Sequence, residues 1–145
     1  MKLSMEESPA HTEPEIIIRY LTMDEPLKRV VAAIRLACGS LIGRQDEQSF
    51  VLNAADVYYF EAVDGRVFLY TEKEVFETSL RLYEIEAGYE ESNFFRASKS
   101  VVANLSKIKS VKAFFNGRFE ANLKNGEKII ISRQYVPVMK KMLGL

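Results

Sequence analysis

From residue 41 onward, hydrophobic residues recur at every second position in short runs, which is the pattern of strands with one buried face. The first half of the chain contains such runs at residues 50–52, 57–61, 67–71 and 75–78. The second half contains them at residues 110–115, 118–123 and 128–132. The pattern predicts a chain rich in short strands.

Dipeptides that favour tight turns separate several of these runs. Asp64-Gly65 lies between two of them, and both positions of such a turn require a positive φ, which Asp and Gly tolerate. Asn116-Gly117 and Asn125-Gly126 separate the last three runs in the same way. We therefore expect a hairpin around residues 64–65 and a three-stranded meander near the C-terminus.

Helical spacing occurs in three places. Over residues 24–38 it places one apolar stripe along a helix, consisting of Leu27, Val30, Val31, Ile34 and Cys38. Thr22 and Glu25 have the spacing of a capping box, Pro26 fits the first turn, and Gly39 suits the helix end. Shorter helices are expected at residues 80–87 and at about residues 134–143, the latter with Pro137 near its start.

The N-terminal part has a different composition from the rest. Residues 1–13 are polar and acidic, which predicts a disordered tail. Residues 16–21 form a β-branched run and predict a strand. Residues 14–43 would then be a strand-helix extension, and residues 44–145 the main domain. The predicted fold class is mainly β with short helices, plus this N-terminal extension.

A net charge of zero hides a sharp division of charge along the chain. Residues 1–93 contain 9 Lys and Arg against 18 Asp and Glu, whereas residues 94–145 contain 11 against 2. Such asymmetry is typical of proteins that bind a polyanion. A folded, basic, strand-rich half favours a nucleic-acid surface. Alternatively, the lysines only solvate the outer faces of strands and protect sheet edges.

Several kinds of protein are disfavoured by what the chain contains. No apolar run approaches the roughly 18 residues of a membrane span, and the first residues, Met1-Lys2-Leu3-Ser4, do not resemble a signal peptide. A single cysteine, Cys38, rules out a disulfide within one chain, and its helical apolar pattern predicts a core thiol. These features predict a cytoplasmic protein.

Catalytic chemistry finds little support in the residue pattern. The only histidine, His11, lies in the predicted tail, so a cluster of Cys and His around a metal is not expected. The glycines are scattered and form no phosphate loop. The acidic pairs Glu84/Glu86 and Glu90/Glu91 fit solvated positions. We expect neither an enzyme nor a cofactor.

The segment at residues 94–105, FFRASKSVVANL, resembles the signature of LytTR-type DNA-binding domains, the effector domains of LytR/AlgR response regulators. The strand at residues 57–61 and the closing segment Ile131-Ser132-Arg133 with Tyr135 resemble further parts of that family. The resemblance extends over about residues 44–145. It implies an elongated fold of stacked β-sheets that inserts loops, and no recognition helix, into successive major grooves.

The resemblance also implies which residues contact DNA. Base contacts would come from Arg66 near the first turn, from Ser98 and Lys99 after the FFR motif, and from Arg133 before the last helix. Many family members carry His where this chain has Ser98, and the shorter Ser discriminates less between base edges. The expected phosphate contacts are Lys99, Ser100, Arg96, Lys107 and Lys109.

Each assignment has a structural alternative. Arg133 would oppose the dipole at a helix N-terminus, which favours a contact role, but it could instead form a salt bridge to Glu120 or Glu127. Ser100 could cap a turn, and Asn104 is expected to bond the local backbone. Phe94 and Phe95 are expected in the core, although exposed rings beside basic residues could stack on RNA bases.

The expected function is a sequence-specific double-stranded DNA-binding transcription regulator. Residues 1–43 are too few for a receiver domain, so control by a receiver is not expected. The resemblance implies binding to two promoter repeats by a homodimer, and a small integral membrane protein encoded nearby as a possible partner. The alternative is a protein-interaction module that keeps the fold, and a weaker one is an RNA-binding domain.

Overall fold

The computed structural model describes residues 1–88 and 93–145 and contains two antiparallel sheets with three α-helices. Glu90 and Glu91 lie outside the described residues. The large sheet consists of β1 (Ser40–Gln45), β2 (Gln48–Asn53), β3 (Tyr59–Val63), β4 (Arg66–Tyr70), β5 (Val75–Thr78), β6 (Phe94–Ser98) and β7 (Val101–Asn104). The small sheet consists of β8 (Ile108–Ala113), β9 (Phe119–Leu123) and β10 (Lys128–Ile131). The prediction of a mainly β fold with short helices is confirmed.

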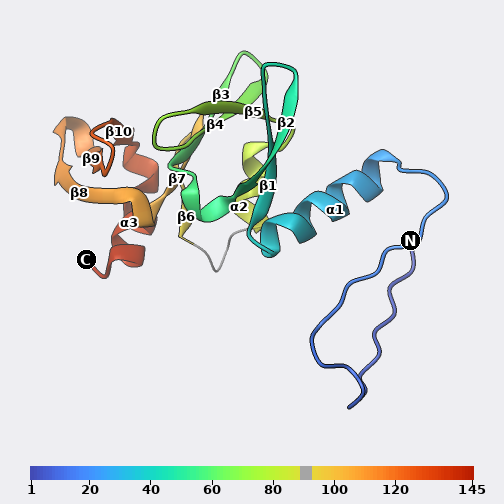
Figure 1. Ribbon diagram of the computed structural model, residues 1–145. Helices are drawn as coiled ribbons and strands as arrows, with labels where there is room; N and C mark the ends of the chain where they lie inside the picture. The colour runs from blue at the N-terminus through green and yellow to red at the C-terminus, as the bar shows by residue number, and fades with distance from the viewer. Residues whose placement is uncertain (89–92) are drawn as a thin grey trace.

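The strands of the large sheet follow the order β2-β1-β5-β4-β3-β7-β6, and those of the small sheet the order β10-β9-β8. In Figure 1 the small sheet and α3 (Val136–Leu143) lie beside the β6–β7 side of the large sheet, while α1 (Glu25–Ala37) lies on its other side. The Ser132 amide donates a hydrogen bond to the Ala97 carbonyl at 2.8 Å, which ties the end of β10 to β6. The sheets are therefore joined into an elongated body.

Two hydrophobic cores lie on opposite faces of the large sheet. Phe60, Leu69 and Phe76 belong to the core on one face, to which α2 (Leu82–Gly88) contributes Leu82 and Ile85. The other face, at β6 and β7, packs against the small sheet and α3. Because successive residues of a strand point to opposite faces, Phe94 joins the first core and Phe95 the second. Both phenylalanines are buried, as predicted.

The predicted hairpin at Asp64-Gly65 is confirmed: the two residues have φ values of 51° and 76° and connect β3 to β4. A second hairpin of the same kind, with Asp46 and Glu47 at positive φ, connects β1 to β2. The sequence did not predict this hairpin. The proposed domain boundary at residue 44 falls inside β1, which pairs along its whole length with β2.

The N-terminal segment differs from its prediction in three respects. No strand forms at residues 16–21; these residues have irregular backbone and run outside both sheets (Figure 1). The α1 cap is Asp24, whose Oδ1 accepts a hydrogen bond from the Leu27 amide at 2.9 Å, and not Thr22. Cys38 is exposed and is not a core thiol, because it follows the last residue of α1. The α1 helix itself is confirmed.

The closing helix α3 and the C-terminal meander β8–β9–β10 agree with prediction. The described part of the chain also contains four 3-10 turns: η1 (Ala54–Asp56), η2 (Leu105–Lys107), η3 (Phe115–Gly117) and η4 (Arg133–Tyr135). Asn104 caps η2 through its side chain and also donates to the Val57 carbonyl at 2.7 Å, so its predicted backbone-bonding role is confirmed. Within the described residues, no helix is long and apolar enough to cross a membrane.

Candidate nucleic-acid interface

The tip of the β6–β7 hairpin presents Lys99 and Ser100, both exposed, at one end of the large sheet. Arg96 holds this tip from behind. Its Nε donates to the Ser98 carbonyl at 2.8 Å, and one Nη donates to the Lys99 carbonyl at 2.6 Å. The other Nη contacts Glu86 at 3.1 Å. Arg96 therefore uses three of its five N–H donors within the protein, and fixes the backbone that carries Lys99.

Ser98 and Ser100 complete the tip. The Ser100 amide donates to the Ser98 Oγ at 3.3 Å, and the two hydroxyl oxygens lie 3.4 Å apart. The Ser98 side chain thus caps the turn, the role that the sequence had suggested for Ser100. Each hydroxyl keeps a free hydrogen-bonding capacity for an incoming ligand.

The chain at Arg133 approaches the strand that ends in this tip, because Ser132, its neighbour in the chain, is bonded to Ala97 of β6. It begins η4, the turn that leads into α3, so its predicted position at a helix N-terminus is confirmed. A Cβ added to Gly117 would lie 3.1 Å from the Cγ and Cδ of Arg133. The aliphatic stem of Arg133 is therefore packed on the backbone of the β8–β9 turn.

Arg133 does not form the salt bridges that were its alternative role. Glu120 pairs with Lys112 at 3.1 Å. Glu127 hydrogen-bonds Tyr59, and burial together with this bond raises the pKa of the Tyr59 hydroxyl. Among the described residues, Arg133 has no acidic partner within ion-pair distance, and it is exposed. Its guanidinium is free to bind a ligand.

The β8–β9 turn next to Arg133 carries an exposed aromatic ring that the sequence analysis did not single out. Phe115 is 63% exposed, and Asn116 and Gly117 follow with φ values of 61° and 73°. The Arg118 guanidinium lies over the rings of Phe115 and Phe114, at 4.4 and 5.0 Å from their centroids. The signal in the sequence was a Phe directly before an Asn-Gly turn, a position that strand pairing leaves outside the sheet.

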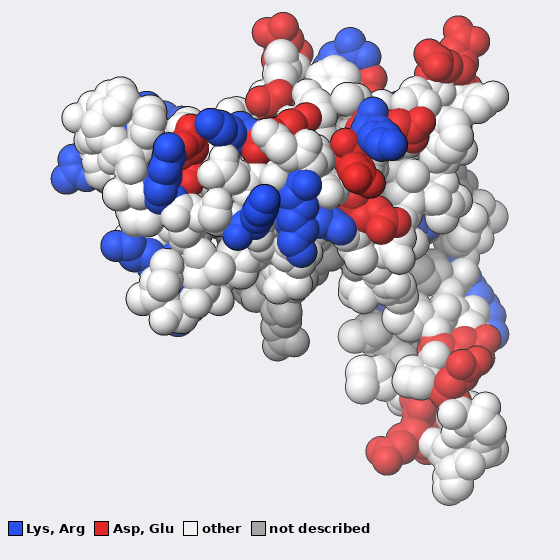
Figure 2. Space-filling view, turned by 60° about the vertical axis from the view of Figure 1, so that its left-hand side comes forward, with Lys and Arg blue, Asp and Glu red and all other residues white. Residues whose placement is uncertain are grey.

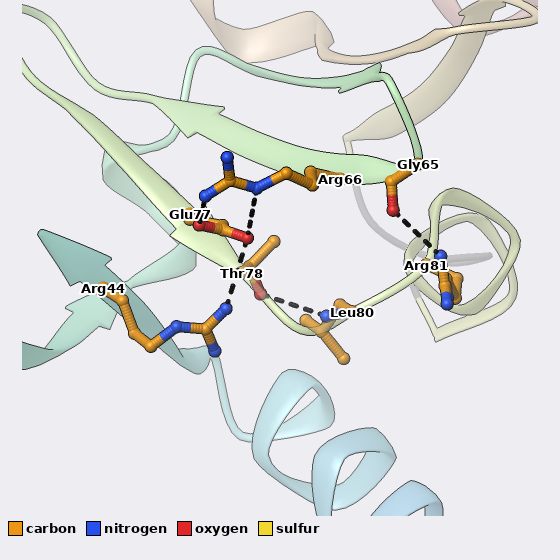
Figure 3. Close-up of polar contacts among 7 residues, drawn as sticks. All are labelled: Arg44, Gly65, Arg66, Glu77, Thr78, Leu80 and Arg81. Atoms are coloured by element: carbon orange, nitrogen blue, oxygen red, sulfur yellow. Dashed lines mark hydrogen bonds and ion pairs between the residues drawn. The ribbon is translucent and has the colours of Figure 1, made fainter.

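Arg66 occupies the same end of the large sheet but is engaged with an acid (Figure 3). Its Nε donates to the Glu77 carboxylate at 3.0 Å, and a second donor completes a bidentate pair. Arg44 approaches the same carboxylate at 3.5 Å. The hydrogen bonds from Arg66 hold the pKa of Glu77 below its usual range. Arg66 therefore lies near the Lys99 tip, but its guanidinium is already paired with the Glu77 carboxylate.

Lys107 and Lys109 lie beyond the other end of β7. The Lys99 tip precedes β7, whereas η2 and the first residues of β8 follow it. The Lys107 ammonium lies 5.3 Å from the Tyr58 ring centroid and lines a shallow polar pocket with Asp56, Glu72 and Glu74. The predicted phosphate-contact residues thus divide into two groups at two ends of β7.

The surface charge follows this division in part. Figure 2 shows Lys and Arg side chains across the left and centre of one face, and Asp and Glu mainly toward its upper and right-hand sides. Exposed cations without carboxylate partners attract phosphate, and their attraction is screened by salt. The end that carries Lys99, Arg133 and Arg118 has the chemistry of an anion-binding surface with one apolar side chain at its edge.

Comparison with known proteins identifies the fold family. The model of the LytTr DNA-binding domain family matches residues 47–144. The chain belongs to the LytTR DNA-binding domain family. A solved structure, the LytTr DNA-binding domain of a Bacillus cereus methyl-accepting/DNA response regulator, superposes with a TM-score of 0.70 at 22% identity. The superposed region covers 74% of this chain and 98% of the Bacillus cereus domain, and this likeness supports the fold.

Two kinds of relative accompany this LytTR chain. The sensory transduction protein LytT of Bacillus anthracis is 34% identical over 100 residues, which are 68% of this chain and 41% of LytT. The chain thus spans about two fifths of the length of that relative. A Staphylococcus aureus protein named as an uncharacterised HTH-type transcriptional regulator is 29% identical over 100% of this chain and 99% of its own length. The family and these names support a DNA-binding regulator.

Proposed function

We propose that this LytTR chain is a sequence-specific double-stranded DNA-binding transcription regulator that reads the major groove through loops. The observation that carries the proposal is the Ser132–Ala97 bond, which brings the chain at Arg133 to the strand that ends in the Lys99 tip; both cations are exposed, and the described residues give neither an ion-pair partner. Arg133 would donate two hydrogen bonds to guanine O6 and N7, and Lys99 would bind phosphate and an adjacent base edge. Ser98 would supply a short-range polar contact.

Loops fit this role better than helices do. The last helix, α3, buries Val136 and Met139 in the second core, so its apolar face is not available for the groove. The β6–β7 tip and η4 instead protrude from the ends of packed strands, where side chains can reach a base while the strands stay rigid. Arg66 would also contact DNA once its guanidinium leaves the Glu77 carboxylate. We propose no catalytic step and no cofactor.

The test is selection followed by a binding measurement. The full chain is used to enrich duplexes from a random pool, and fluorescence anisotropy then compares the enriched duplex with a scrambled one over a range of salt concentrations. We expect preference for the enriched duplex and a fall in log K of about 0.9 per neutralised phosphate per log unit of salt. Equal and weak binding of both duplexes would favour the protein-interaction module, and preference for a single-stranded RNA would favour the RNA-binding alternative.

Control by a receiver domain is not part of the proposed mechanism. The Staphylococcus aureus relative matches this chain over nearly its whole length, which supports a regulator of this layout. We propose that the chain binds DNA in the cytoplasm without phosphorylation. Acetyl phosphate should leave its DNA affinity unchanged, and a change in affinity would contradict this part of the proposal.

We also propose that two copies bind two promoter repeats, with residues 14–43 as the contact between protomers. The support is an exposed apolar segment ahead of α1, which includes Ile16, Ile17, Tyr20 and Leu21. A chain that lacks residues 1–39 keeps β1 intact and should bind one repeat but lose cooperative binding of two repeats. Unchanged cooperativity would contradict the homodimer. It would leave the segment as a docking site for another protein, such as a small integral membrane protein.

A further inference from the structure

The β8–β9 turn combines features that packing within the chain does not require. Phe115 is 63% exposed although it is one of the largest apolar side chains. Phe115 belongs to neither of the two hydrophobic cores, so its ring is not needed to fill the interior. An exposed ring of this size indicates a binding surface when charged or polar side chains surround it.

The ring is nevertheless held in one place. Phe114 contacts it with a centroid separation of 4.5 Å, and the Arg118 guanidinium covers it at 4.4 Å from the centroid. The Arg118 Nε also donates to the Phe115 carbonyl at 3.3 Å, and the Phe114 amide donates to the Arg118 carbonyl at 2.8 Å. The turn therefore presents a pre-organised ring, which lowers the entropic cost of using it in binding.

The ring also lies next to the residue that the proposed function uses most. Gly117 is two residues after Phe115, and its backbone packs against the Arg133 stem. Residues 113–119 contain no Asp or Glu, so no carboxylate in the turn repels a phosphate. Phe115 and Arg133 are thus parts of one surface, one apolar and the other cationic.

We propose that Phe115 contacts the C5-methyl group of a thymine in the major groove, next to the base pair that Arg133 reads. This inference rests on the proposed DNA-binding function. A phenyl ring against a thymine methyl is a recognised form of apolar base readout, and it distinguishes thymine from the other bases. Arg118 is a positioning residue that fixes the ring and adds positive charge beside the phosphates. The surface would read an A·T pair next to a G·C pair.

The experiment removes the methyl group and the ring separately and together. In the enriched duplex, each thymine is replaced in turn by deoxyuridine, which lacks only the C5-methyl group. Binding of full-length wild-type protein and of Phe115→Ala is measured by anisotropy. For wild-type protein we expect one replacement to lower affinity by about fourfold, the factor that corresponds to one buried methyl-sized group. For Phe115→Ala the same replacement should have no effect, because its contact is already absent.

Two variants serve as controls. Tyr83→Ala removes a ring that is also exposed, at 62%, but lies on α2, and it should keep the wild-type response to deoxyuridine. Phe115→Leu keeps an apolar contact and should retain part of the response. The inference is overturned if Phe115→Ala binds as tightly as wild-type protein, or if each replacement affects both proteins equally. If wild-type protein enriches no sequence from the pool, the proposed function fails instead.

Discussion

The two ends of β7 carry similar residues in different surroundings. At one end, Lys99 is exposed on a hairpin tip that Arg96 holds, and it takes part in none of the ion pairs among the described residues. At the other end, Lys107 is half-buried against the Tyr58 ring and shares a pocket with several acids. The difference shows that a count of basic residues does not locate a binding surface. What matters is whether each cation already has a partner within the fold.

The largest effect is expected at Arg133, because its exposed guanidinium forms no ion pair with any described residue and is the proposed base-reading group. Arg133→Ala should weaken binding to the enriched duplex by roughly 1–3 kcal/mol and relax the preference at one base pair. The anisotropy assay on enriched and scrambled duplexes measures both. Equal loss on the two duplexes would mean that Arg133 binds phosphate and does not read a base.

A smaller and less selective effect is expected at Lys99. Lys99→Ala should weaken binding to all duplexes and reduce the slope of log K against log salt by about 0.9, the value for one phosphate contact. A salt titration with enriched and scrambled duplexes tests this. An unchanged slope would place the phosphate contacts elsewhere and remove the main distinction between the two ends of β7.

Glu77 offers a test at the same end of the large sheet as Lys99, because it is the ion-pair partner of Arg66. Glu77→Gln should raise DNA affinity, by several-fold at most, because Arg66 no longer has to leave a carboxylate. The pKa of Glu77 is lowered in the folded protein, so its ion pairs contribute stability at neutral pH and lose it only as the pH falls through that lowered pKa. The variant should therefore be slightly less stable in urea at neutral pH and lose less stability on acidification. Weaker DNA binding by Glu77→Gln would show that Glu77 positions Arg66 for DNA.

The smallest effect is expected at Lys107. Lys107→Ala should leave both DNA affinity and the salt slope close to those of wild-type protein, because this cation already packs on Tyr58 among acidic residues. It removes the same charge as Lys99→Ala and is therefore its matched control. A loss equal to that of Lys99→Ala would show that DNA contacts both ends of β7.

The strands that the sequence predicted are those with clear alternation, and the missed ones lack it for identifiable reasons. β6 was missed because both of its faces are buried, one in each core. β1 has Gly43 at its centre, where a Cβ would lie 2.7 Å from the Phe76 Cβ, so the alternation is interrupted by close packing. The prediction of a strand at residues 16–21 was wrong. β-branched residues form a strand only beside a partner strand, and none lies next to this segment among the described residues.

The candidate site was predictable only in part. The resemblance to LytTR domains pointed to Lys99 and Arg133, and the structure bonds Ser132, which precedes Arg133, to Ala97, two residues before Lys99. The bidentate pair between Arg66 and Glu77 could not be predicted, because it depends on which residues lie near each other across strands. The Asn-Gly turn indicated that Phe115 lies outside the sheet, but its place next to Arg133 depends on tertiary packing.

The brace that Arg96 provides has a kinetic consequence. Because its guanidinium already holds the Ser98 and Lys99 carbonyls, at 2.8 and 2.6 Å, the tip needs no ordering step when it meets a duplex. Association should then proceed at a rate set by diffusion and charge steering, and this rate should fall as salt rises. Without the Arg96 contacts, the tip would have to become ordered each time the protein meets DNA. Arrival would become slower and less sensitive to salt, whereas the lifetime of the formed complex would still be set by Arg133 and its neighbours.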